Sequence, residues 1–224
     1  MLVSAIEGHR LWASVYDEAS NPMLAIEDRE LPEVLGDVAG LRAIDVACGT
    51  GRWMTWLLSR GANVVGFDLC AEMLARAAAK SGIGGRLGLA DAARLPVASE
   101  SADLVLCSLA IAYFEDLRAT FSGFARTLRR GGRLVIGDVH PASIASGSTR
   151  SFSVDDASFE MRHYAWSTSD LLHAAGDVGL QLEAAHDVCH GPAEKHFYQR
   201  AGMMDVYHAT LHVPAIWIAS WKRP

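Results

Sequence analysis

The 224-residue sequence lacks any apolar run long enough to cross a bilayer, since a spanning helix needs about 20 consecutive apolar residues. Its opening stretch, MLVSAIEGHRLW, places Glu7 and His9 where a signal peptide would need an apolar core. It also lacks internal repeats and low-complexity tracts. We therefore expect no membrane span and no secretion signal.

Cysteine is scarce, and no two cysteines form a CxxC pair. Each lies in or beside a predicted core strand, where cysteine usually packs as a small hydrophobic residue. This pattern argues against a disulfide framework and predicts a reduced, cytoplasmic setting. The four cysteines are Cys48, Cys70, Cys107 and Cys189.

Positive charge is also in deficit, because 20 Lys and Arg face 26 Asp and Glu, for a net charge of -6. No extended basic stretch is available to hold a nucleic-acid backbone, so a nucleic-acid partner is disfavoured. Hydrophobic residues make up 50% of the chain and charged residues 21%, which is enough for a real core.

From residue 41 onward, short apolar runs alternate with stretches of helical periodicity. This pattern is typical of βαβ units and predicts an α/β fold with a mostly parallel sheet. The predicted strands are Leu41–Ala47, Asn63–Phe67, Arg86–Ala90, Ala102–Ser108, Arg133–Gly137, Leu180–His186 and Pro214–Trp221. The predicted helices are Gly51–Arg60, Ala71–Lys80, Asp116–Arg130 and a capped helix from Thr168 or Ser169 to Gly179.

A glycine turn, Asp45-Val-Ala-Cys-Gly49-Thr-Gly51, follows the first of these strands. Glycine lets the backbone approach a ligand closely, and the next helix presents free N–H groups to a carboxylate or a phosphate. The dinucleotide fingerprint requires a small residue three positions after its second glycine. Met54 occupies that position, which argues against a dinucleotide.

Acidic residues follow the next two strands as well, at Asp68 and Asp91. Ligands of an open parallel sheet bind beyond the carboxyl ends of its strands, and an acid about 20 residues after the turn commonly holds a ribose diol. Each acid alone could be a helix cap. Three acids at successive strand ends favour a ligand site, and several carboxylates suit a cation better than a pyrophosphate.

At these residues the chain resembles the class I S-adenosylmethionine-dependent methyltransferases, in the small-molecule branch that includes the ubiquinone-biosynthesis type. The resemblance runs from about Arg42 to Val139, over AIDVACGTGRW, GFDLCAEML, GLADAARLP, SADLVLCSLAIAYFED and LRRGGRLVIGDVHP. It implies a Rossmann-like, doubly wound sheet of seven strands, the last antiparallel. We expect one methyltransferase domain over 1–224: an N-terminal helical cap over the sheet's edge (1–40), a cofactor-binding core (41–140) and an acceptor-side insert with the last two strands (141–224). The Ser-, Ala- and Gly-rich segment Ala142–Asp156 is predicted to be a loop.

The resemblance assigns cofactor roles to residues that match the family's motifs. Asp45 and the backbone of Ala47, Cys48, Gly49 and Gly51 would hold the amino and carboxylate ends of the cofactor. Asp68 would accept from both ribose hydroxyls. The remaining predicted contacts are Leu69 and Met73 on the adenine, Asp91 and Ala92 at its amino group, Ser108 and Leu109 along the methionine arm, and Tyr16 closing over it from WASVYDEASNP.

Methyl transfer is a direct displacement, so the main demand on the protein is to align the reactants in a dry pocket. Two residues are candidate catalytic groups: His140, just past the fifth strand, and Tyr113, after the fourth. His140 could instead cap the turn before Pro141, a common role for a loop histidine. The expected acceptor is a small molecule, and aromatic residues near the site suit a flat or apolar one.

The residues leave other interpretations open. An NAD(P)-dependent oxidoreductase is the first, although position 54 is too large for it. A non-catalytic cofactor-binding protein on the same fold is the second, because fold does not fix function. No metal is predicted in the cofactor site, and the His- and Cys-containing C-terminal third has no repeated zinc spacing. The sequence leaves open whether the protein is a monomer or a homodimer.

Overall fold

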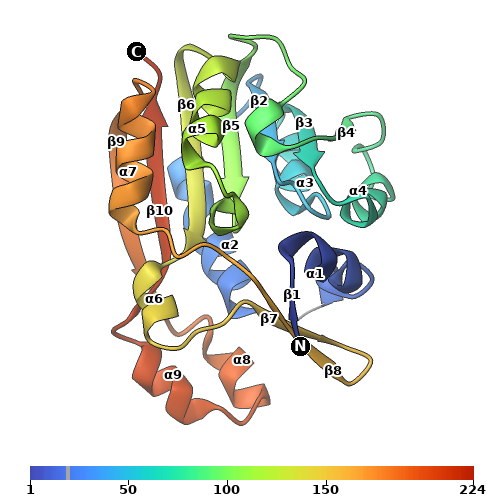
Figure 1. The fold of residues 1–224 in the computed structure, drawn as a ribbon, viewed down its shortest axis with the longest axis vertical. Helices are drawn as coiled ribbons and strands as arrows, with labels where there is room; N and C mark the ends of the chain where they lie inside the picture. The colour runs from blue at the N-terminus through green and yellow to red at the C-terminus, as the bar shows by residue number, and fades with distance from the viewer. Residues whose placement is uncertain (19–20) are drawn as a thin grey trace.

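The computed structural model describes residues 1–18 and 21–224. Its centre is a seven-stranded sheet in the order β4-β3-β2-β5-β6-β10-β9 (Figure 1). The strands β4, β3, β2, β5 and β6 pair in parallel, and β10 pairs antiparallel with both β6 and β9. The predicted doubly wound, mostly parallel sheet with an antiparallel last strand is therefore confirmed.

The strands of this sheet start and end close to the predicted positions, except that β6 begins five residues before the predicted Arg133. They are β2 (Arg42–Val46), β3 (Asn63–Asp68), β4 (Leu87–Leu89), β5 (Ala102–Ser108), β6 (Leu128–Val139), β9 (Gln181–Cys189) and β10 (Pro214–Lys222). The helices of the predicted core are α3 (Arg52–Ser59), α4 (Ala71–Ala78), α5 (Leu117–Thr127) and α7 (Thr168–Asp177).

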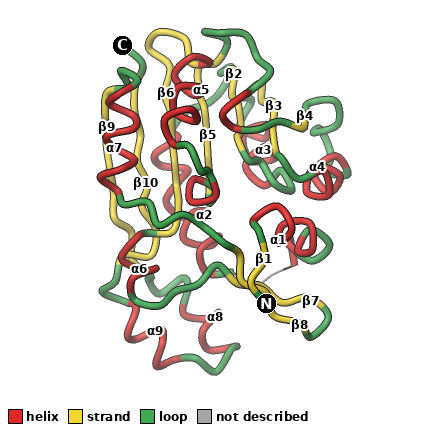
Figure 2. Tube along the Cα trace, in the orientation of Figure 1, coloured by secondary structure: helices red, strands yellow, loops and turns green. Residues whose placement is uncertain are grey.

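Both faces of the sheet are covered by helices (Figure 2). Side chains alternate along each strand, so Leu104 and Leu106 pack against α2 (Pro22–Leu35) and α3, and Val105 and Cys107 face α5 and α7. All four side chains are buried, which explains why the sequence of β5 is apolar almost throughout. Covering both faces leaves the carboxyl ends of the strands as the open edge for a ligand.

The N-terminal segment differs from the predicted cap over the sheet's edge. Helix α2 packs on the face of the sheet against β6 and β10, whereas α1 (Ala5–Trp12) contacts α4 and the strands β7 and β8. Figure 1 shows α1 below the carboxyl ends of β3 and β5. Positions 19 and 20 of the predicted cap segment lie outside the described residues. The segment contains the predicted helices, but α2 lies on a face of the sheet and not at its edge.

The predicted loop Ala142–Asp156 is wrong. It contains helix α6 (Pro141–Ala145) and strand β7 (Ser151–Val154), which forms a hairpin with β8 (Ala157–Met161). The turn residues Asp155 and Asp156 both have positive φ, the geometry that tight hairpins require. Strand β1 (Leu2–Val3) pairs with β8, so the hairpin also fixes the N-terminus beside α1.

The remaining short elements are the 3-10 helices η1 (Tyr16–Glu18), η2 (Ala92–Arg94) and η3 (Ile111–Tyr113), and the helices α8 (Lys195–Arg200) and α9 (Met204–Thr210). Within the described part of the chain, every helix is too short or too polar to cross a membrane.

Candidate active site

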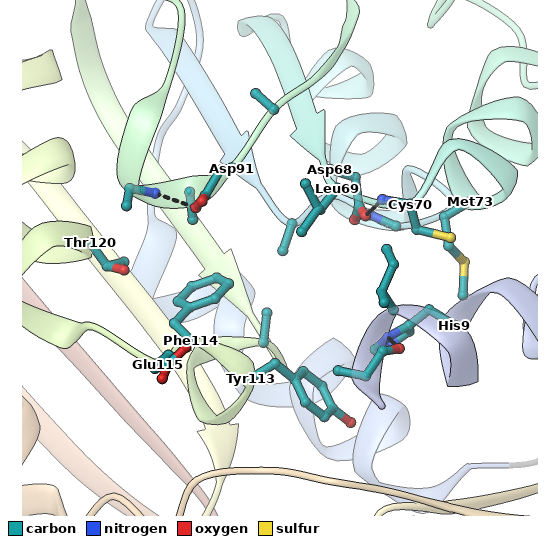
Figure 3. Close-up of a pocket in the computed structure, with 18 of the residues that line it drawn as sticks. His9, Asp68, Leu69, Cys70, Met73, Asp91, Tyr113, Phe114, Glu115 and Thr120 are labelled. Atoms are coloured by element: carbon teal, nitrogen blue, oxygen red, sulfur yellow. Dashed lines mark hydrogen bonds between the residues drawn. The ribbon is translucent and has the colours of Figure 1, made fainter. Parts of the chain in front are cut away.

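A cavity of about 710 Å³ lies at the carboxyl ends of the parallel strands. Its wall carries Asp68 and Asp91 from the ends of β3 and β4, and His9 and Tyr113 from α1 and η3. Figure 3 shows these side chains around an open centre, with Asp91 and Asp68 on the side away from Tyr113. The structure thus brings together acids that are 23 residues apart in the sequence, as the sheet topology predicts.

Most of the predicted cofactor residues meet at this cavity. Asp45 and Cys48 instead line a small adjoining hollow of about 40 Å³, which shares Tyr16 and Gly49 with the larger one. Gly51 lines neither. The predicted residues on the larger cavity are Tyr16, Ala47, Gly49, Asp68, Leu69, Met73, Asp91, Ala92, Ser108 and Leu109.

The glycine turn has the backbone conformation expected of a ligand loop. Ala47, Gly49 and Gly51 all have positive φ, and a Cβ on Gly49 would meet nothing within 4 Å. Gly49 therefore leaves open space beside the cavity. A Cβ on Gly51 would lie 2.9 Å from Ile83 Cδ1, so Gly51 serves the close packing of the turn on the region after α4.

The large side chain of Met54 on α3 is accommodated by a glycine, Gly66, on the neighbouring strand β3. Met54 is fully buried, and a Cβ added to Gly66 of β3 would lie 2.3 Å from its sulfur. The dinucleotide fingerprint places its small residue on the helix. Here the strand supplies it, so α3 packs closely on the sheet with a large side chain on its own surface.

Asp68 links the glycine turn to the start of α4. Its Oδ2 accepts from the Gly49 N–H at 2.7 Å, and its Oδ1 accepts from the Cys70 N–H at 2.8 Å. Each carboxylate oxygen has a second lone pair, so both can accept a further bond from a ligand. Asp91 caps η2 through the Ala93 N–H at 2.9 Å, and its other oxygen faces no bonded group among the described residues.

Asp45 is a buried acid with an unpartnered oxygen. It is 2% exposed, and its Oδ2 has no hydrogen-bond partner in the described part of the chain. Burial raises the pKa of Asp45 to about 8; Arg52 opposes the shift, and Asp68 and Glu27 add to it. A buried, protonated carboxyl beside the glycine turn is suited to a cationic group, whose charge would stabilise its ionised form.

The cap segment is held to the glycine turn by Asp17. Its Oδ1 accepts from the Thr50 hydroxyl at 2.6 Å, and its Oδ2 pairs with Lys80 Nζ at 2.8 Å. These bonds fix the neighbouring Tyr16 over the turn, where it lines the cavities. Tyr16, which was predicted to close over the site, thus lines the cavity, and the neighbouring Asp17 holds it in place.

A buried polar network that the sequence analysis did not predict supports the same region. Glu27 of α2 is fully buried, pairs with Arg52 of α3 and accepts from the Ser108 hydroxyl at 2.7 Å. Ser108 in turn accepts from Trp53 Nε1 at 3.0 Å. Burial raises the pKa of Glu27, and Arg52 and Ser108 counteract it. Since its partners come from distant elements, no local sequence signal could reveal Glu27.

A second cavity, of about 620 Å³, adjoins the first and shares His9, Tyr16, Leu109 and Tyr113 with it. Its other walls combine apolar side chains with polar ones such as Glu18 and Asn21, and Trp12 stacks on Phe152 there at 5.0 Å between ring centroids. The apolar lining residues include Trp12, Val15, Met23, Val139, Phe152, Met161 and Met203.

Arg150, on the wall of this second cavity, forms an ion pair with Asp138. Both are buried, and Arg150 Nη2 donates to Asp138 Oδ1 at 2.6 Å. Asp138 also accepts from the Ala112 and Val139 N–H groups. The guanidinium lies 5.0 Å from the Tyr113 ring centroid, a cation–π arrangement. The pair therefore holds η3, and with it Tyr113, at the junction of the cavities.

The two candidate catalytic residues are placed differently. Tyr113 lies where both cavities meet, and burial raises the pKa of its phenol, so the hydroxyl is an intact donor. His140 lines neither cavity. Its Nδ1 accepts from the Ala142 N–H at 2.9 Å and its Nε2 lies 3.3 Å from Asp187 Oδ1, so it caps α6, the alternative left open above.

Two of the C-terminal histidines have hydrogen-bond contacts of their own. His190 lies 2.8 Å from the Tyr198 hydroxyl, and His196 Nδ1 bonds the Ala193 carbonyl at 2.8 Å. Over residues 1–18 and 21–224, no three His, Cys, Asp or Glu side chains gather in a way that could hold a metal ion.

Comparison with known proteins adds to this geometry. Residues 44–136 match the family model described as a methyltransferase domain. The malonyl-[acyl-carrier protein] O-methyltransferase of Hamiltonella defensa is 30% identical over 62% of this chain and 51% of its own length. The nocamycin O-methyltransferase of Saccharothrix syringae is 33% identical over 65% of this chain and 56% of its own. The chain thus spans about half the length of these curated relatives.

A crystal structure of an S-adenosylmethionine-dependent methyltransferase from Mesorhizobium loti aligns with a TM-score of 0.71 at 26% identity, over 91% of this chain and 100% of that one. The fold and the cavity at its strand ends are those of a cofactor-binding α/β protein. Together with these matches they show that the chain is similar to S-adenosylmethionine-dependent methyltransferases, in sequence over residues 44–136 and in fold over 91% of its length.

Proposed function

We propose that the protein transfers a methyl group from S-adenosylmethionine to a small-molecule acceptor. The observation that carries this proposal is the junction of two cavities, one walled by acids at the strand ends and the other by aromatic and sulfur-containing side chains. Two reactants bound in them would meet at the four shared residues, among them His9 and Tyr113. A binding protein that never brings two ligands together has no need of this arrangement.

The lining of the larger cavity and of the adjoining small hollow supports this choice of cofactor. Asp68 has free lone pairs for ribose hydroxyls, Asp91 has a free oxygen for the adenine amino group, and Leu69 is 58% exposed, available to pack on a ring. At the amino-acid end of the cofactor, Asp45 offers a carboxyl oxygen without a hydrogen-bond partner, and the open space beside Gly49 lets a ligand approach the backbone. When bound, S-adenosylmethionine supplies an electrophilic methyl group on a sulfonium cation.

The contribution of the protein to such a transfer is positioning and exclusion of water. Aligning two reactants in a dry site can provide several kcal/mol of rate enhancement, on the order of 7–11 in the best intramolecular models. Tyr16 of η1 and Tyr113 of η3 both lie at the junction of the two cavities. The hydrogen bonds of Asp17 hold Tyr16 in place, and the Asp138–Arg150 pair holds Tyr113. Because side-chain hydrogen bonds and ion pairs hold both tyrosines before any ligand binds, the junction is pre-organised.

The second cavity indicates the kind of acceptor. Its Trp12, Phe152 and Met161 side chains favour an apolar or aromatic body, and thioethers contact aromatic rings well. The named relatives methylate oxygen, which supports an oxygen nucleophile here. The net charge of -6 disfavours a nucleic-acid partner, and the four cysteines, which form no disulfide, support a cytoplasmic setting.

Tritium from methyl-labelled S-adenosylmethionine tests the proposed acceptor class without knowledge of its identity. The protein is incubated with a cell extract, and the label is counted in the small-molecule filtrate and in the macromolecular fraction. We expect label in the filtrate. Label in the protein fraction would also agree with the proposal if hydroxylamine releases it as an acyl derivative, because the methylated group is then a small acyl group carried on a protein. Label confined to nucleic acid or to hydroxylamine-stable protein would overturn the proposal, as would none above an Asp68→Ala control.

Asp45 leads to a prediction about protons. At pH 7 a carboxyl with a pKa of about 8 is mostly protonated in the free protein. An ammonium group bound nearby lowers that pKa, so binding of S-adenosylhomocysteine should release nearly one proton. Calorimetry at pH 7 in phosphate and in Tris, whose ionisation enthalpies differ, measures the release. Asp45→Asn should abolish it, and equal binding enthalpies of the native protein in both buffers would refute the prediction.

A further inference from the structure

We propose that His9 is the general base of the reaction and that the acceptor presents a neutral hydroxyl, whose proton passes to His9 Nε2. This inference rests on the proposed function and deepens it. His9 belongs to α1, lines both cavities and meets the Tyr113 ring edge-to-face at 5.1 Å between centroids. Figure 3 shows the two rings adjoining along one side of the cavity.

The tautomer of His9 is fixed by its own helix. Its Nδ1 lies 2.8 Å from the Ala5 carbonyl oxygen. A carbonyl oxygen can only accept, so Nδ1 carries the proton, and in the neutral ring Nε2 keeps its lone pair. The part of the chain that the structure describes supplies no hydrogen-bond partner for Nε2. The basic nitrogen Nε2 therefore points away from the helix backbone, and His9 lines both cavities.

The charge state of His9 also suits a base. Burial lowers the pKa of its imidazole below the ordinary 6.5, and Arg150 lowers it further, while the Ala5 carbonyl and Asp68 oppose the shift. The groups that face His9 from other elements are Asp68 after β3, Tyr113 of η3 and Arg150 before β7. The free ring is thus neutral at physiological pH and able to accept a proton.

The surroundings favour a hydroxyl over a carboxylate acceptor. Among the described residues that line the second cavity, Arg150 is the one Lys or Arg side chain, and Asp138 at 2.6 Å balances its charge. A carboxylate would therefore enter a partly apolar cavity without a free counter-charge, which is costly. A carboxylate is also ionised at neutral pH and needs no base, whereas a hydroxyl must lose a proton as it reacts.

The proposed step balances as follows. The acceptor oxygen forms a bond to the methyl carbon, and the electron pair of the broken carbon–sulfur bond stays on sulfur. The hydroxyl proton moves to His9 Nε2, and the resulting imidazolium returns it to solvent. Tyr113, whose phenol stays protonated, can donate to the same acceptor oxygen and hold its remaining lone pair in place.

Nitrogen-15 NMR of the histidine rings tests the tautomer and the charge in the protein without ligands. We expect His9 to show a pyrrole-type Nδ1 and a pyridine-type Nε2, with a titration midpoint below 6.5, and to keep this tautomer with S-adenosylhomocysteine bound. A protonated Nε2 in the neutral ring, or a midpoint at or above 6.5, would overturn the inference. This readout does not depend on turnover.

A pair of probe acceptors tests the chemistry. 1-Naphthol and 1-naphthoate present the same fused ring through a hydroxyl and a carboxylate. We expect methylation of 1-naphthol, with kcat/KM rising with pH through a midpoint below 6.5. His9→Asn keeps a donor for the Ala5 carbonyl and removes Nε2, so it should lower kcat/KM by about a hundredfold or more. It should change the Kd for S-adenosylhomocysteine less than threefold.

His196→Asn is the matched control, because His196 Nδ1 bonds a carbonyl at the same 2.8 Å but the residue is exposed and lines neither cavity. It should leave turnover unchanged. Methylation of 1-naphthoate alone, or full 1-naphthol activity in His9→Asn, would overturn the role of His9 and leave the proposed function standing. A protein that fails to bind S-adenosylhomocysteine would instead refute the proposed function.

Discussion

Asp138→Ala is expected to lower the free energy of unfolding by about 4 kcal/mol, the largest effect on stability that we predict. Removing the carboxylate leaves the Arg150 guanidinium buried without a counter-charge. It also removes the acceptor for the Ala112 and Val139 N–H groups. Urea unfolding, with the midpoint and slope compared between variant and native protein, measures the change.

A second variant separates charge from packing. In Asp138→Ala combined with Arg150→Met no buried charge is left unpaired, so the double variant should be more stable than Asp138→Ala alone. Arg10→Ala breaks the exposed pair with Glu7 at 2.7 Å and should leave the unfolding midpoint close to that of the native protein. A loss below about 1 kcal/mol for Asp138→Ala would mean that the pair is not the buried anchor described here.

Asp68→Ala is expected to weaken binding of S-adenosylhomocysteine by roughly a hundredfold, or about 3 kcal/mol. The substitution removes a charged acceptor proposed to hold the ribose hydroxyls, and it frees the Gly49 N–H, whose bond at 2.7 Å orders the glycine turn. Calorimetric titration gives the affinity, and urea unfolding checks that the variant is folded.

Asp37→Ala is the control for this loss. Asp37 also accepts from a backbone N–H, that of Ala39 at 3.0 Å, but it is exposed and lines neither cavity. Its replacement should leave the affinity unchanged. An affinity within threefold of native in Asp68→Ala would mean that the ligand site has been assigned to the wrong strand end.

The sheet could be predicted because each of its strands carries its own signal. The apolar run in β5 and the glycine turn after β2 are local features, and the order of motifs fixes the topology. The hairpin of β7 and β8 was missed because Ser and Gly around it suggest a loop. Phe152 and Met161 are buried there largely because the hairpin packs against α1, a contact that the local sequence does not reveal.

The candidate site was predictable to the same extent. Acids at strand ends lie near one another in any parallel sheet, so Asp68 and Asp91 could be placed from the sequence. The partners of Arg52 and Arg150 could not, because Glu27 and Asp138 lie 25 and 12 residues away in the chain, on other elements, and meet them only in the folded protein. His140 seemed better placed than His9 because it follows a core strand, whereas the position of His9 depends on how α1 packs.

Calorimetric titration of the native protein with S-adenosylhomocysteine and, separately, with NAD⁺ tests the central claim most directly. The acids at the strand ends predict saturable binding of S-adenosylhomocysteine at one site and no binding of NAD⁺. Saturable binding of NAD⁺ with no heat from S-adenosylhomocysteine would contradict the assignment of this site.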